Sequence, residues 1–164
     1  MSKLVNYSLA VIFVLVLLDQ GAKTLVRAYV PLHRSSTLLP NLIDLTHVEN
    51  KGVSFSVMGD LSDQFRVPLL ISISLLALVV LAYYWWQQRR NLNALSHFAF
   101  QLILGGAIGN LIDRALFGAV TDFLHFRFYD TSFFVNNMAD IFISAGVVAY
   151  LLGMIRLKRR HQTS

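Results

Sequence analysis

Four long stretches of the chain consist almost entirely of apolar side chains. They cover residues 4–23, 67–86, 95–113 and 138–156, and each is close to the ~20 residues that an α-helix needs to cross the hydrocarbon core of a bilayer. The second of them contains no charged residue at all. The pattern predicts an all-α membrane protein, with four transmembrane helices in a single membrane domain.

Two longer polar connections, residues 28–64 and 114–137, join the first helix to the second and the third to the fourth. In the first connection, residues 42–48 alternate between apolar and polar positions, which is typical of a strand. Residues 50–52, Asn-Lys-Gly, favour a tight turn because glycine adopts positive φ, and residues 53–57 alternate again. We therefore expect a small extracytoplasmic β-hairpin, with a short loop or helix beside it.

The composition supports a membrane protein. Hydrophobic residues make up 55% of the chain and charged residues only 14%, whereas a soluble domain of average composition has about a quarter of its residues charged. The net charge is +5, but a basic nucleic-acid-binding surface would not come with this apolar content. Anionic lipid headgroups are the expected partner, and nucleic acid is not. The absence of cysteine excludes disulfides, thiolate nucleophiles and cysteine-ligated zinc.

The positions of the charged residues predict an orientation. Four helices place both termini on one side of the membrane, and Arg89, Arg90 and the basic tail at 156–160 lie close to helix ends on that side. The positive-inside rule then puts the termini in the cytoplasm. All nine acidic residues fall on the opposite side. The first helix is expected to be retained, because it ends in Asp-Gln-Gly-Ala-Lys at residues 19–23 rather than in a small-x-small cleavage site.

Polar and charged residues at the outer helix ends are the candidate functional groups. An ionisable side chain in a membrane segment costs free energy, so its presence there indicates a functional role. Topology brings them to one level of the membrane, although it does not show that they touch. Two simpler interpretations stay open: an acid in the first turn of a helix is favoured by the helix dipole, and Asp113 could neutralise Arg114. The residues at this level are Asp19, Asn110, Asp113, Arg114, Asp122 and Asp140.

Other chemistries find less support. The five histidines have no metal-ligand spacing, and neither H-E-x-x-H nor G-x-S-x-G occurs. A serine–lysine pair formed by Ser54 or Ser56 with Lys51 or Lys23 would lie on an exposed hairpin, which would not desolvate the lysine enough to lower its pKa. Carboxylates are left, and a carboxylate pair can hydrolyse an amide without a metal or cofactor. Two other classes remain possible: a proton- or ion-coupled transport component and a noncatalytic scaffold.

Small residues on the third helix, Gly105, Gly106 and Gly109, allow helix backbones to approach closely, so we interpret them as packing residues.

Five motifs are spread over essentially the whole chain: Asp19-Gln20 with Lys23, residues 48–55 (VENKGVSF), residues 105–114 (GGAIGNLIDR), residues 118–123 (GAVTDF) and residues 136–140 (NNMAD). In this order they resemble the lipoprotein signal peptidases, a family of membrane aspartic proteases. One departure from the family pattern is Asn136, which stands where the family usually has Phe; nearby Phe133 and Phe134 are expected to fill that space.

The resemblance implies an enzyme of the bacterial inner membrane that cleaves prolipoproteins before a diacylglyceryl-modified cysteine. It implies an active site at the periplasmic face, no metal or cofactor, and prolipoprotein substrates and membrane lipid as partners of a monomer. Asp122 and Asp140 match the catalytic pair. The residues that match supporting or substrate-binding positions are Asp19, Lys23, Asn50, Gly52, Asn110, Asp113, Arg114 and Asn137.

The chemistry of such a pair follows from electrostatics. Two close carboxylates cannot both ionise cheaply, so one of them keeps a proton near neutral pH. The hairpin and the loop around residues 59–64 are expected to cover the substrate.

Overall fold

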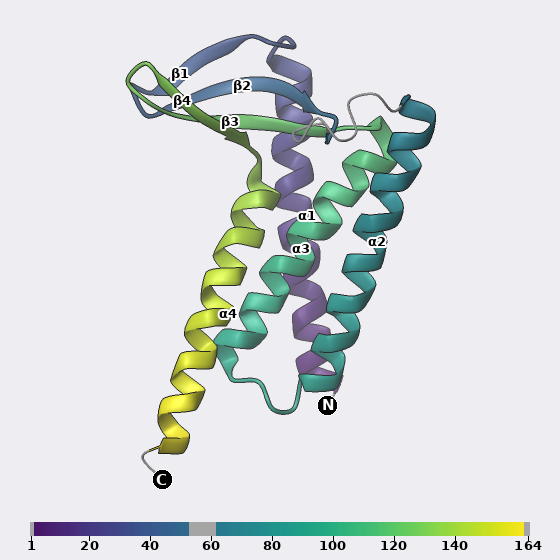
Figure 1. Cartoon of the computed structure of the whole chain (residues 1–164), viewed down its shortest axis with the longest axis vertical. Coiled ribbons are helices and arrows are strands. Elements are labelled where there is room, and N and C mark those ends of the chain that lie inside the picture. The colour runs from purple at the N-terminus through teal and green to yellow at the C-terminus, as the bar shows by residue number, and fades with distance from the viewer. Residues whose placement is uncertain (1, 53–61, 163–164) are drawn as a thin grey trace.

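The computed structural model describes residues 2–52 and 62–162. Figure 1 shows a helical bundle with a sheet across one end, and both termini lie at the other end. Each helix contains a stretch of 18 or more residues that is apolar enough to cross a membrane, which confirms the four predicted spans. The helices are α1 (Ser2–Tyr29), α2 (Asp63–Gln88), α3 (Ala94–Phe117) and α4 (Met138–Gln162).

Helix α3 is the centre of the bundle, because it packs against each of the other three helices. Asn93 caps its first turn by accepting the backbone N–H of Ser96. The helix ends at Gly118, whose φ of 71° is the left-handed conformation that glycine adopts without strain. More of α3 is buried than of α2, most of which is exposed along its apolar length. That exposed apolar surface is what lipid contact requires.

Glycines of α3 bring two neighbouring helices unusually close. A Cβ atom on Gly106 would lie 2.4 Å from the carbonyl oxygen of Ala139 in α4. On Gly109 it would lie 2.4 Å from Oδ2 of Asp19, and on Gly105 it would lie 2.9 Å from a side-chain atom of α1. A larger residue at Gly105 or Gly106 would require α1 or α4 to move away from α3, and one at Gly109 would displace the carboxylate of Asp19.

The sheet combines both outer connections of the chain (Figure 1). Its strands are antiparallel and follow the order β1-β2-β3-β4. Strands β1 and β2 come from the first connection, whereas β3 and β4 come from the second, where no strand was predicted. The description "all-α" is therefore too narrow. The strands are β1 (Ser35–Leu39), β2 (Ile43–Asn50), β3 (Val120–Phe128) and β4 (Thr131–Asn136).

The prediction of the hairpin is confirmed for one of its strands, and its second strand is not tested. The strand expected over residues 42–48 corresponds to β2, but β2 forms its hairpin with β1, which precedes it. On its other edge β2 pairs with β3, and the predicted partner, residues 53–57, lies outside the described residues. The positive φ expected in the turn is present at Gly52, where φ is 72°. The expected covering loop, residues 59–64, is described only from residue 62 onward.

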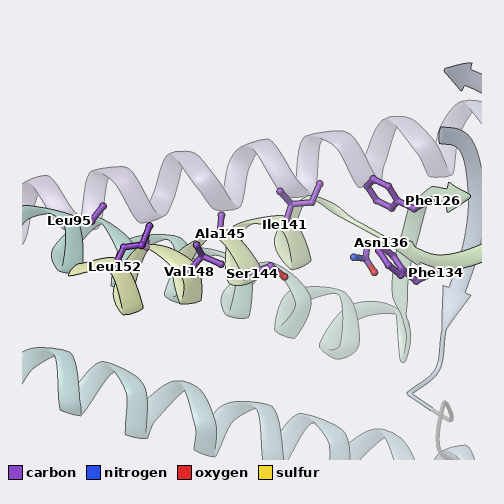
Figure 2. A pocket seen from close by; sticks show the side chains of 10 residues that line it. Leu95, Phe126, Phe134, Asn136, Ile141, Ser144, Ala145, Val148 and Leu152 are labelled. Atoms are coloured by element: carbon purple, nitrogen blue, oxygen red, sulfur yellow. The ribbon is translucent and has the colours of Figure 1, made fainter. Parts of the chain in front are cut away.

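An apolar groove of about 570 Å³ is lined mainly by α4, with residues of β3 and β4 at one end (Figure 2). Phe126 and Phe134 form its upper end, with ring centroids 5.2 Å apart. Asn136 lies beside them, as Figure 2 shows, and the groove continues down α4 to Leu152. Phe134 thus occupies the space near Asn136, whereas Phe133 precedes it on β4 and points to the opposite face of the sheet.

Candidate active site

Asp122 and Asp140, here called the aspartate pair, come from separate elements at the sheet end of the bundle. Asp122 is the third residue of β3 and is only 2% exposed, while Asp140 lies in the first turn of α4. Asn137 contacts both residues. Its Nδ2 donates to Oδ1 of Asp122 at 2.6 Å, and its Oδ1 accepts the backbone N–H of Asp140 at 3.0 Å. One side chain therefore links the two segments.

The start of α4 explains the position of Asp140. Besides the bond from Asp140 N–H to the Asn137 side chain, the backbone N–H of Asn137 donates to Oδ2 of Asp140 at 3.4 Å. This reciprocal pattern is that of a capping box. Asp140 therefore does act as a helix-terminal acid, but only its Oδ2 atom takes part in the cap. Its Oδ1 atom accepts a hydrogen bond from Nδ2 of Asn110 at 2.8 Å, so the cap does not rule out a functional role.

Asn50 holds the other side of Asp122. Its Nδ2 donates to Oδ2 of Asp122 at 2.9 Å, while its Oδ1 accepts the backbone N–H of Gly52 at 2.9 Å. Because a backbone N–H can only donate, the amide oxygen of Asn50 must face Gly52 and its NH₂ group must face Asp122. The pairing of β2 with β3 places these residues together, with Val48 opposite Asp122.

The environment of Asp122 raises the pKa of its carboxyl group from 3.8 to about 6. Burial is the largest cause of this rise. The hydrogen bonds from Asn50 and Asn137 oppose this rise, and the nearby charge of Asp140 adds to it. Asp122 therefore changes protonation much closer to neutral pH than an ordinary aspartate does.

A buried ionic cluster lies behind the aspartate pair. Lys23, Asp19 and Asp113 are all fully buried, and Nζ of Lys23 lies 2.9 Å from Oδ2 of Asp19 and 3.5 Å from Oδ2 of Asp113. Lys23 also donates to Oδ1 of Asn110 at 2.9 Å. The cluster thus connects α1 to the part of α3 that contacts Asp140.

Three further residues join this cluster without having been assigned a role from sequence. Gln20 donates from Nε2 to Asp19, Asp113 and the carbonyl oxygen of Gly109, at 3.1, 3.2 and 3.0 Å. Nη1 of Arg27 donates to Oγ1 of Thr121 at 2.9 Å and to Oδ1 of Asp113 at 3.4 Å. A signal existed for Arg27: Asp19, Lys23 and Arg27 are spaced four residues apart, which places them on one face of α1.

Three of the predicted site residues, Arg114, Asp113 and Gly52, have no hydrogen bond to the carboxyl groups of the aspartate pair among the contacts described above. The guanidinium of Arg114 interacts electrostatically with Asp140, Asp122 and Asp113. Asp113 does more than neutralise its neighbour, because its ion pairs are with Lys23 and Arg27. Gly52 contributes its backbone N–H to Asn50.

The arrangement suits proton transfer. Two carboxyl groups lie at the sheet end of the membrane helices, and amide N–H donors hold both of them. Within residues 2–52 and 62–162, no three His, Cys, Asp or Glu side chains gather as metal ligands would.

Known proteins of one family match nearly the whole chain. The family model described as signal peptidase (SPase) II matches residues 11–156. The lipoprotein signal peptidase of Syntrophotalea carbinolica is 40% identical over 147 residues, which cover 90% of this chain and 89% of that protein. That of Sulfurihydrogenibium sp. is 32% identical over 164 residues and is matched over 100% of both chains.

A solved structure is also similar. It is a bacterial membrane enzyme determined by the in meso method at 1.9 Å resolution, with a TM-score of 0.79 and 26% identity. The similarity covers 91% of this chain and 92% of that one. Together with the family model and the relatives, the shared bundle and sheet lead to one conclusion: the chain belongs to the signal peptidase II family, the lipoprotein signal peptidases that process prolipoproteins.

Proposed function

We propose that this peptidase is an aspartic endopeptidase, with Asp122 and Asp140 as its catalytic residues. It removes the signal peptide of a prolipoprotein by cleaving before the diacylglyceryl-modified cysteine. The observation that carries the proposal is the position of Asn137, which hydrogen-bonds to Asp122 and to the backbone of Asp140 at the end of the membrane helices. No metal or other cofactor takes part in the proposed reaction.

In the proposed mechanism, one member of the aspartate pair is ionised and the other is protonated. The ionised carboxylate takes a proton from water as the water oxygen attacks the scissile carbonyl carbon, and the protonated carboxyl gives its proton to the carbonyl oxygen. When the tetrahedral gem-diol intermediate collapses, the C–N bond breaks: the carboxyl group that is now protonated gives its proton to the leaving nitrogen, and the other carboxylate takes a proton from one hydroxyl of the gem-diol, which restores the pair. The pair titrates as a unit, so acid and base are not assigned to individual residues.

The site's location fits this chemistry. The sheet end faces the periplasm in our proposal, and the termini lie in the cytoplasm of an inner-membrane protein that acts as a monomer. At that level water reaches the pair, while the substrate's apolar segment and acyl chains arrive through the lipid. The alternative of a proton- or ion-coupled transport component is not favoured by the family to which the chain belongs.

A cleavage assay tests the proposed reaction. Purified protein in detergent or lipid, mixed with a diacylglyceryl-modified prolipoprotein, is expected to release the signal peptide, with a new N-terminus at the modified cysteine. Because carboxylates do the chemistry, metal chelators and reagents directed at serine or cysteine should leave the rate unchanged. Inhibition by a chelator, reversed by adding a metal, would contradict the aspartic mechanism.

The pH dependence of kcat/KM should respond to Asn50. The Asn50→Leu substitution removes an N–H donor that stabilises ionised Asp122, so the pKa of Asp122 rises further above its value of about 6. Whichever limb of the profile Asp122 governs is therefore expected to move to higher pH. Asn91→Leu, on the exposed loop at the other end of the bundle, is the matched control. A shift to lower pH would contradict the assigned hydrogen bond.

A further inference from the structure

The apolar groove on α4 has its polar groups near one end only. Two of the side chains that line it, Asn136 and Ser144, are polar, and all the others are apolar. Asn136 lies at the upper end, beside the rings of Phe126 and Phe134 (Figure 2). From Ser144 down to Leu152 the lining is apolar. The groove therefore suits a ligand with a polar head near the sheet and an apolar tail along the helix.

The length of the groove matches one leaflet of a bilayer. Its α4 side runs from Ile141 to Leu152, which is about 16 Å of helix. One leaflet of the hydrocarbon core is about 15 Å thick, and a lipid acyl chain spans one leaflet. A second helix of that length, about 10 Å across, would need roughly twice the groove's volume of about 570 Å³. A single acyl chain fits better than a helix.

The groove is continuous with the aspartate pair. Ser144, at one edge of the groove, lies one helical turn below Asp140, and side chains four residues apart share a face of a helix. Asn136, at the upper end, immediately precedes Asn137, which hydrogen-bonds to the side chain of Asp122 and to the backbone of Asp140. A group held at the pair is therefore next to the entrance of the groove.

The proposed substrate carries a matching group at this level. Its diacylglyceryl-modified cysteine follows the scissile bond directly, so its glycerol esters are held close to the pair. The NH₂ group of Asn136 can donate to an ester carbonyl oxygen. A bilayer phospholipid offers the same chain and the same esters. The continuity of groove and pair favours the substrate's own lipid, because that lipid is covalently held beside the pair.

We propose that the groove is the subsite for one acyl chain of the substrate's diacylglyceryl group, and that Asn136 binds the ester of that chain. The subsite makes cleavage sensitive to the length of the acyl chain as well as to the peptide. It contributes to substrate binding and not to the chemical step. This inference rests on the proposed function of the aspartate pair.

The test compares two prolipoprotein peptides that differ only in the acyl chains on the cysteine, dipalmitoyl or dibutyryl. In Ala145→Phe, a ring fills the middle of the groove, and KM for the dipalmitoyl peptide is expected to rise roughly tenfold, as overpacking implies, with kcat unchanged. Ala145 lies about 6 Å below Ile141, beyond the reach of the short chains, so KM for the dibutyryl peptide is expected to stay the same. Comparing variants on one peptide removes the effect of its partition into detergent.

Two results would overturn the proposal. An unchanged KM for the dipalmitoyl peptide would mean that bilayer lipid, and not the substrate, occupies the groove. An equal rise of KM for both peptides would mean that the substitution disturbs the active site instead of blocking a chain.

Ala10→Phe is the matched control, because it makes the same change at an exposed position of α1 that does not line the groove. It is expected to leave both KM values unchanged. A rise equal to that in Ala145→Phe would show that any added ring on a lipid-exposed helix has this effect, which would overturn the specific role of the groove. Thermal melting shows that each variant is folded.

Asn136→Leu tests the polar end of the subsite independently. It keeps the size of the side chain but removes the amide, so KM is expected to rise roughly three- to tenfold, the loss of one hydrogen bond. The rise should affect both peptides, because both carry the ester. An unchanged KM would overturn the role of Asn136. The proposed function fails separately, through active variants of the aspartate pair.

Discussion

Replacing either Asp122 or Asp140 by asparagine is expected to lower kcat for prolipoprotein cleavage by roughly 10²–10⁴-fold, the usual contribution of general acid–base catalysis. Asparagine has nearly the same volume but cannot exchange a proton. The effect is measured as the rate of signal-peptide release by purified variants, with thermal melting to show that each is folded.

Because the two carboxyl groups act as a unit, the double variant should be little slower than either single variant. Asp44→Asn provides the control: Asp44 is also buried, at 5% exposed, but it pairs with Arg127 on β3 instead of contacting the aspartate pair. It should keep its wild-type kcat. Normal turnover by Asp122→Asn or Asp140→Asn would end the assignment of the pair.

Removing Asn137 is the second change expected to have a large effect. Asn137→Ala deletes the donor to Asp122 and the acceptor for the N–H of Asp140. Both carboxyl groups then lose a contact that holds them together, and since a misplacement of about 1 Å can cost 10²-fold in rate, we expect a loss of kcat of at least that order.

The control for this variant is Asn91→Ala, which removes a surface amide that donates to the side chain of Gln88 at 3.3 Å. Asn137→Asp adds information, because it keeps an oxygen for the N–H of Asp140 but has no NH₂ group for Asp122. It should therefore also be slow. If Asn137→Ala cleaves at the wild-type rate, the link between the two segments is unimportant for catalysis.

The four helices could be predicted from sequence because their cause is local. A backbone in lipid must satisfy its own hydrogen bonds, and a stretch of about 20 apolar residues can do so only as a helix. The sheet was predicted poorly for the opposite reason. Strand β2 finds its partners in β1 and in β3, and β3 comes from a connection far away in the chain. Alternation of polar and apolar residues indicates a strand but not its partner.

The residues of the candidate site also fall into two groups: some were predicted from the sequence, and others became evident only from contacts between helices. Motifs and topology placed Asp19, Asp122 and Asp140 at one level of the membrane, and the match to the signal peptidase II family assigned the catalytic pair as an expectation. Gln20, Arg27 and Thr121 were missed, although they contact Asp113 or the segments around it. Their roles depend on how closely α1 and α3 approach at Gly109, which no local pattern specifies.

Hydrophobic length and the order of charges along the chain are local properties, so they were enough to predict four membrane spans and the level of Asp19, Asp122 and Asp140. The carboxylate to which each asparagine donates depends instead on contacts between elements that are far apart in the chain. An amide can present either its oxygen or its NH₂ group, and the choice depends on the partner. For Asn110 that partner is the ammonium of Lys23, on another helix.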